Sequence, residues 1–208
     1  MTTSDEGAPL REAFECTFEF QPGWIDLTLR EVVNRLNPRA LEIEKSAVLD
    51  DMVERAVDLN EDVPTLAAAY YSGAGEALAN LTVDSYGDEG VPRPDADEVI
   101  PLLLEWGNAQ VTGEPRISHL DLAAGPAVRV QAMLQVKRML GFGRKLTEFI
   151  KYAVFPPGMQ SLIVVTVTWE KITLTEEIAE LADEAVRSLR ITPLATGGTA
   201  IPTDGGTS

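Results

Sequence analysis

Residues 162–169, LIVVTVTW, decide the fold class of this chain. They are nearly all β-branched or apolar, which is typical of a buried β-strand. A turn at Pro156-Pro157-Gly158 precedes this strand, and a helix is predicted to follow it from Thr175, which we interpret as the N-cap residue. The C-terminal third is therefore expected to combine a central strand with a helix that follows it.

Outward from this strand, the sequence alternates between predicted hairpins and predicted helices. Period-2 alternation or short apolar runs predict strands at 14–20, 24–29, 66–71, 77–86, 117–122, 127–136 and 149–155. Apolar residues at helical spacing predict helices at 38–59, after an Asn37-Pro38 start, and from Asp95 to near Gly107. Because short turns such as Gly125-Pro126 join most strands, the sheet is antiparallel. We predict an α+β fold with an antiparallel sheet of about six or seven strands flanked by three helices, an α/β/α sandwich.

The length of 208 residues fits one domain. Residues 1–12 are polar and acidic, and residues 192–208 are rich in Gly, Thr and Pro. Neither segment carries enough apolar side chains to offset the entropy cost of ordering it. We expect a flexible N-terminus at 1–12, a single α+β domain at 13–191 and a disordered tail at 192–208.

The charge balance excludes two classes of partner. The chain holds 17 Lys and Arg against 33 Asp and Glu, a formal net charge of −16. A field of that sign repels phosphate backbones and anionic lipid, so we expect no nucleic-acid binding. The N-terminus has no basic stretch followed by an apolar one, and no run reaches 18 apolar residues. We therefore expect a cytoplasmic protein without membrane insertion.

Scarcity of reactive residues argues against most catalytic schemes. Cys16 is the only cysteine and His119 the only histidine, so Cys/His zinc sites are excluded, and a catalytic triad would need His119. We expect a non-enzymatic protein with no cofactor and no metal. One alternative stays open: His119 and Asp121 share one face of a predicted strand, as in a small-ligand-binding domain or hydrolase, although Ser118 points to the other face.

Two further motifs have simpler interpretations. A row of acidic residues at helical spacing could gather a divalent cation but is better explained as a solvated helix face, with Lys45 and Arg55 nearby; the row is Asp50, Asp51, Glu54 and Asp58. Gly73 and Gly75 resemble a phosphate loop only weakly, because a GK[ST] motif is absent and a strand, not a helix, is predicted to follow.

The most suggestive stretch is KRMLGFGRKLTEFIK, residues 137–151, which carries five basic residues in an otherwise acidic chain. We predict that its first part docks a protein partner, either an acidic surface or a second copy of the chain. The predicted partner-binding residues are Lys137, Arg138, Met139, Leu140, Phe142, Arg144 and Lys145. Alternatively, Phe142 folds back onto the sheet and the basic residues offset neighbouring carboxylates. The excess of acidic residues lies in the first two-thirds of the chain, since residues 126–208 hold 8 acidic and 9 basic residues.

Three stretches resemble the PsbP-like or Mog-type α/β/α sandwich family, which includes the bacterial DcrB and LpqN-like proteins. They are the opening strand followed by Pro22-Gly23-Trp24, the hairpin DLAAGPAVRVQ at 121–131, and YAVFPPGMQSLIVVTVTW at 152–169 with its following helix up to Ile191. The resemblance implies a scaffold for binding or assembly without a shared catalytic site. Several bacterial members carry an export or lipoprotein signal, and no such signal is recognised in this sequence. Self-assembly through a free sheet edge, or through the tail from Pro193 onward, is a further alternative.

Overall fold

The structure is a computed structural model that describes residues 12–28, 47–87, 90–107, 109–137 and 144–194. The strands in these ranges are β1 (Phe14–Thr17), β2 (Trp24–Asp26), β3 (Leu66–Tyr71), β4 (Ala77–Tyr86), β5 (Ala109–Leu122), β6 (Gly125–Lys137), β7 (Arg144–Val154), β8 (Leu162–Trp169) and β9 (Arg190–Pro193). The helices are α2 (Ala47–Leu59), α3 (Ala96–Leu103), the short 3₁₀ turn η1 (Ile172–Leu174) and α4 (Thr175–Ser188).

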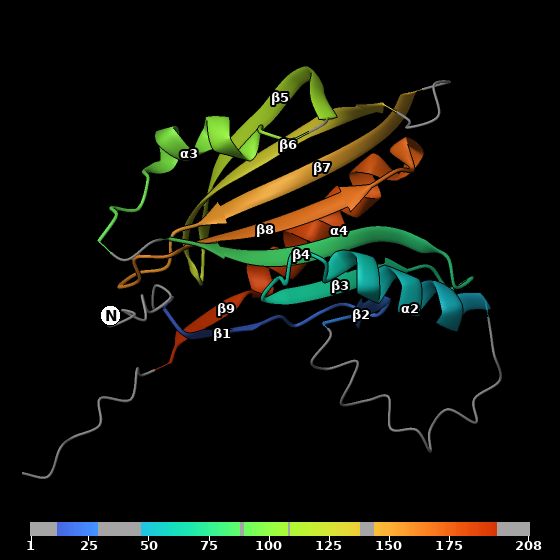
Figure 1. The fold of residues 1–208 in the computed structure, drawn as a ribbon, viewed down its shortest axis with the longest axis horizontal. Helices are drawn as coiled ribbons and strands as arrows, with labels where there is room; N and C mark the ends of the chain where they lie inside the picture. The colour runs from blue at the N-terminus through green and yellow to red at the C-terminus, as the bar shows by residue number, and fades with distance from the viewer. Residues whose placement is uncertain (1–11, 29–46, 88–89, 108, 138–143, 195–208) are drawn as a thin grey trace, which may run out of the picture.

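Seven of these strands form one antiparallel sheet in the order β2-β3-β4-β8-β7-β6-β5, and β1 pairs with β9 separately. This confirms the predicted α+β sandwich. Figure 1 shows α2 and α3 on one face of the sheet and α4 behind it on the other. The strand at 162–169 lies in the middle of the sheet as β8, between β4 and β7.

The alternation along β8 assigns its side chains to two different cores. Ile163, Val165 and Val167 pack in the larger core with α4. Leu162 and Val164 pack in a second core beneath α3. Burial on both faces explains why this strand is nearly continuously apolar, in contrast to the alternating pattern of a strand with one face in solvent. A third, smaller core holds α2 against β3 through Ala56 and Ala69.

Several element boundaries differ from the sequence predictions. Only Ala47–Leu59 of the helix predicted at 38–59 is described, and its predicted start at Asn37-Pro38 lies outside the described residues. The opening strand ends at Thr17, because its partner β9 is only four residues long. Helix α3 ends at Leu103, and Trp106 follows it in irregular backbone.

Three further corrections come from pairings that are distant in the sequence. Strand β5 begins at Ala109, eight residues before the predicted strand, because β6 pairs with it over almost its whole length. Thr175 is the first residue of α4 and Leu174 is its N-cap; the Thr175 hydroxyl donates instead to Glu148 of β7. Strand β9 includes Thr192 and Pro193, which the sequence placed in the C-terminal tail.

Candidate functional site

The face of the sheet that carries α2 and α3 is only partly covered. Helix α3 packs over β6 and β7, α2 packs over β3, and the central strands β4 and β8 lie between them (Figure 1). A hollow of about 550 Å³ opens here, bounded by α3, residues 91–94 and strands β4, β7 and β8. We call it the helix-face groove.

The position of α3 sets the upper wall of the helix-face groove. Asp95 begins this helix with a capping box: its carboxylate accepts from the backbone N–H groups of Asp97 and Glu98, both at 2.9 Å, and the Glu98 carboxylate accepts from Asp95 N–H at 3.0 Å. Such a cap satisfies N–H groups that the first helical turn leaves free. Val99 and Leu103 are thereby buried on the sheet, while Leu102 remains 53% exposed at the groove.

The floor of the helix-face groove carries a polar row across three adjacent strands. Lys151 of β7 is the register partner of Thr166 of β8, which is in turn the partner of Thr82 of β4. Directly paired residues on neighbouring strands place their side chains on the same face, about 5 Å apart. One ammonium and two hydroxyl groups therefore form a row across β7, β8 and β4, and all three residues line the groove.

Lys151 is a half-buried cation without a carboxylate partner. Its Nζ lies 4.1 Å from the centre of the Trp106 ring and 5.8 Å from that of Phe149. No carboxylate oxygen of the described residues lies within 4.0 Å of Lys151 Nζ, the distance limit for an ion pair. Burial lowers the pKa of the Lys151 ammonium, and the charges of Asp84 and Glu105 only partly oppose this effect. The groove thus contains a positive charge that is poorly solvated and not neutralised by direct contact.

A second hollow of about 600 Å³ adjoins the first and shares Thr82 and Tyr86 with it. Asp84 lies in this second hollow, where it accepts a long hydrogen bond of 3.5 Å from the Thr82 hydroxyl. Burial raises the pKa of the Asp84 carboxyl. Unlike charges therefore lie on the same sheet face, in two neighbouring hollows.

His119 and Asp121, the pair named by the sequence, lie elsewhere. Both are exposed on edge strand β5, beside a hollow of about 150 Å³ near the start of α3. They share one face as predicted, because their register partners Val128 and Pro126 are two residues apart on β6. Within the described part of the chain, no hydrogen bond or ion pair joins the imidazole to the carboxylate. The hollow is smaller than the several hundred cubic ångströms typical of a ligand site.

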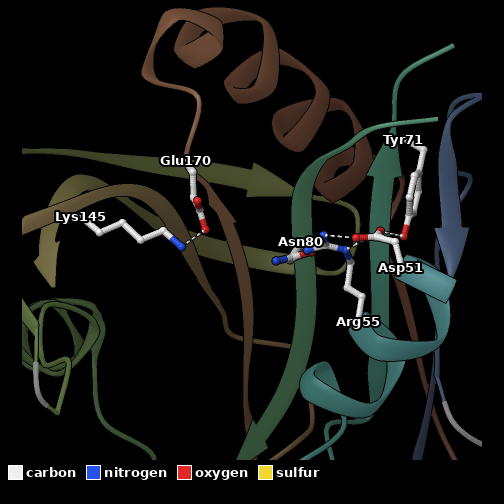
Figure 2. Close-up of polar contacts among 6 residues, drawn as sticks. All are labelled: Asp51, Arg55, Tyr71, Asn80, Lys145 and Glu170. Carbon is white, nitrogen blue, oxygen red and sulfur yellow. Dashed lines mark hydrogen bonds and ion pairs between the residues drawn. The ribbon is translucent and has the colours of Figure 1, made fainter. Parts of the chain in front are cut away.

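The acidic row of α2 separates into two kinds of residue. Asp50, Glu54 and Asp58 are exposed. Asp51 instead joins a network that fastens α2 to the sheet (Figure 2): Arg55 donates to it at 3.1 Å, the Tyr71 hydroxyl donates to it at 2.8 Å, and Arg55 also donates to Asn80 at 3.0 Å. Among the described residues, no group of three or more metal-ligating side chains is suitably placed for an ion.

The Asp51 network predicts a pH dependence of stability. Hydrogen bonds, first from Arg55 and then from Tyr71, lower the pKa of Asp51 below its ordinary value of 3.8. A lowered folded-state pKa contributes stability that is complete above 3.8 and is lost as the pH falls through the lower, folded value. We expect Asp51→Asn to be less stable at pH 7 by no more than about 1 kcal/mol, because the Asp51 side chain is 42% exposed.

The measurement is urea unfolding of the wild type and of Asp51→Asn between pH 7 and pH 2. The wild type should lose more stability than the variant as the solution is acidified. Asp50→Asn is the matched control, since its carboxylate is exposed one residue earlier on the same helix. A variant that loses as much stability as the wild type over this range would contradict the assignment.

The predicted partner-binding stretch runs from the last residue of β6 to the first residues of β7. Lys137 and Arg144 are register partners, so β6 and β7 extend beyond the strands predicted at 127–136 and 149–155. Lys145, on β7, forms an ion pair with Glu170 (Figure 2). The remaining predicted residues, Arg138, Met139, Leu140 and Phe142, lie outside the described residues. Docking of a partner at residues 137–145 stays a prediction.

The sequence motifs did not predict the helix-face groove, although the sequence contains one signal for it. Lys151 closes the basic stretch at 137–151, but it follows buried Phe149 and Ile150 within β7. A lysine at a core-facing position is the signal, because lysine is rarely buried without a reason. Thr82 and Thr166 gave none, since threonine is common in any strand.

These observations define an antiparallel α+β sandwich in which α2 and α3 cover one face of the sheet incompletely. No family model matches the chain, and no curated protein matches it. A distant structural likeness exists to LpqN of Mycobacterium tuberculosis, a protein described as involved in cell envelope biogenesis. The two chains are 13% identical, with a TM-score of 0.47, over 89% of this chain and 90% of that one. Similarity at this level does not extend to ligand or partner.

One expectation from the sequence is corrected by this comparison. The expectation of a cytoplasmic location is withdrawn: LpqN, the structural neighbour, is described as involved in cell envelope biogenesis, and a likeness at this level assigns this chain to no compartment. That expectation rested on the composition of the N-terminus and on the lack of a long apolar run. Separately, the described helices include none with the length and apolar character needed to cross a bilayer.

Proposed function

We propose that this chain is a non-enzymatic binding protein whose helix-face groove takes a small organic ligand. The observation that carries the proposal is the hollow of about 550 Å³ over the uncovered centre of the sheet. Clefts of roughly 300–1,000 Å³ with mostly apolar walls and a few placed polar groups are typical ligand sites. The helix-face groove has both properties.

Exposed apolar side chains around the helix-face groove support this proposal. Tyr86, Val91 and Leu102 are 56%, 57% and 53% exposed, and all three line the groove. An apolar ligand that covered them would remove this surface from water, which contributes roughly 25 cal/mol per Å². Large apolar side chains gathered at a hollow indicate a binding surface more strongly than the same residues scattered singly.

The surroundings of the two rare reactive residues favour binding over catalysis. Cys16 packs against the core on the α4 side, and burial raises the pKa of its thiol to about 12. A thiol that stays protonated at neutral pH is a poor nucleophile. His119 is exposed beside a different, smaller hollow and does not line the helix-face groove.

Binding of a neutral apolar probe tests this proposal. We expect N-phenyl-1-naphthylamine to bind the wild type with increased fluorescence, and Leu102→Glu to weaken binding by about tenfold, because a carboxylate replaces apolar contact surface. Val57→Glu is the matched control: Val57 is 61% exposed on α2 and does not line the groove. Absence of binding, or equal binding by all three proteins, would refute the proposal.

A further inference from the structure

We propose that the ligand of the helix-face groove is an organic oxoanion, whose charged group is held by Lys151 and Thr166 while its apolar part lies along α3. This inference rests on the proposed function and names the ligand class. It is carried by three observations: the register of the polar row, the absence of a side-chain hydrogen-bond partner for Lys151 and Thr166 among the described residues, and the apolar wall beside them.

The polar row supplies hydrogen-bond donors at the spacing of adjacent strands. Lys151 and Thr166 are direct register partners on β7 and β8, and both line the groove. Among the described residues, neither the Lys151 ammonium nor the Thr166 hydroxyl has a side-chain hydrogen-bond partner. A carboxylate or sulfonate placed over the row could accept from both groups, and charge-assisted bonds of this kind are the stronger ones in proteins.

The nearest protein charges leave the ammonium open to a ligand. Asp84 on β4 and Glu105 after α3 are the carboxylates that act on Lys151, and both lie beyond ion-pair distance. Coulomb attraction falls with distance and is stronger where water is partly excluded. An oxoanion in direct contact with Nζ would therefore interact more strongly with it than either carboxylate does.

The apolar part of the ligand has a wall next to the polar row. Val164 lies two residues before Thr166 on the same face of β8, and Leu102 projects from α3 over the same hollow. Lys151 Nζ lies 4.1 Å from the centre of the Trp106 ring, which places the ammonium beside this wall. A molecule with its charge at one end and a flat or short apolar body at the other fits this arrangement.

The net charge of −16 does not exclude an anionic ligand. At physiological ionic strength, exposed charges are screened beyond about 8 Å, whereas the half-buried ammonium acts at contact distance. The overall charge slows the approach of an anion, and the local contact determines whether it stays bound.

The experiment compares two probes that differ by one sulfonate. We expect 8-anilinonaphthalene-1-sulfonate to bind the wild type more tightly than the neutral N-phenyl-1-naphthylamine in 0.15 M salt. Lys151→Met should weaken sulfonate binding by about tenfold or more and change neutral-probe binding by less than about twofold, because only a charged hydrogen bond is lost. Thr166→Val should weaken sulfonate binding by about threefold to tenfold.

Matched controls are available on the same strands and surface. Thr168→Val removes a hydroxyl two residues along β8 on the same face but outside the helix-face groove. Lys171→Met removes an exposed lysine that pairs with Glu76. Both should leave the two affinities unchanged. Circular dichroism and the melting temperature verify folding, and loss of a half-buried charge should not destabilise Lys151→Met.

Each other outcome is decisive. If the wild type binds the neutral probe but not the sulfonate, the anion inference fails while the proposed function stands. If Lys151→Met weakens both probes equally, or neither, the anion inference also fails. If the wild type binds neither probe, both the inference and the proposed function fail.

Discussion

Replacing Gly125 with alanine is expected to lower the free energy of unfolding by about 3 kcal/mol or more. Gly125 begins β6 with a φ of +131°, a conformation that L side chains rarely adopt. An added Cβ would lie 2.4 Å from the carbonyl oxygen of Phe155, which is backbone and cannot rotate away. Strain and steric overlap therefore act together, and urea unfolding measures their sum.

Gly113→Ala is the matched control for this prediction. Gly113 also has a positive φ, +76°, but nothing lies within 4 Å of the position where its Cβ would be. Only the conformational cost remains, about 1 to 2 kcal/mol. If the two variants were equally destabilised, the contact with Phe155 would have no part in the effect.

Replacing Asp183 with alanine is expected to cost about 3 kcal/mol of stability, because it leaves two buried donors without an acceptor. The Asp183 carboxylate on α4 accepts from Arg129 Nε at 2.9 Å and from the Tyr152 hydroxyl at 2.5 Å. Tyr152 is fully buried, and the Arg129 side chain is only 13% exposed. Burial, followed by the Asp183 charge, raises the pKa of Tyr152, so the phenol remains a donor at any physiological pH.

Glu180→Ala provides the comparison for Asp183, since Glu180 is exposed on the same helix one turn earlier. Its effect should be within about 0.5 kcal/mol of zero. The double variant Asp183→Ala with Tyr152→Phe should be destabilised by less than the sum of the effects of the two single variants. The hydroxyl that Asp183→Ala leaves without an acceptor is then absent. Full additivity in thermal and urea unfolding would show that the network does not couple α4 to the sheet.

The candidate site was much less accessible from sequence than the fold. The residue pair that the sequence named, His119 and Asp121, was chosen because a histidine beside a carboxylate has obvious chemistry. In the sequence, Lys151 stands out only as the last member of a basic stretch. The feature of Lys151 that supports the proposed site is the lack of a carboxylate partner among the described residues, inside a partly apolar groove, and this feature depends on what α3 and β8 place around the side chain.

Misplaced boundaries have the same origin. Alternation predicted an opening strand to residue 20, but β1 extends only as far as its partner β9, which lies at the other end of the chain. Phe18 and Phe20 are still partly buried against the core, so their apolar character was real even though their hydrogen-bonding state was not predictable. Strand length is set by pairing, and pairing at long range has no local signature.

The sequence by itself determined the class of fold, because its signals are local. The strands at 66–71, 77–86 and 162–169 and the cap at Asp95 follow from residue spacing and turn chemistry within a few positions. Only the tertiary structure decided where a ligand could bind. It inserted β8 between β4 and β7, which brings Thr82, Lys151 and Thr166 together on one face, and it left the middle of that face free of helix (Figure 1). The relative placement of distant segments depends on burying area across the whole sheet, and no short stretch of sequence contains it.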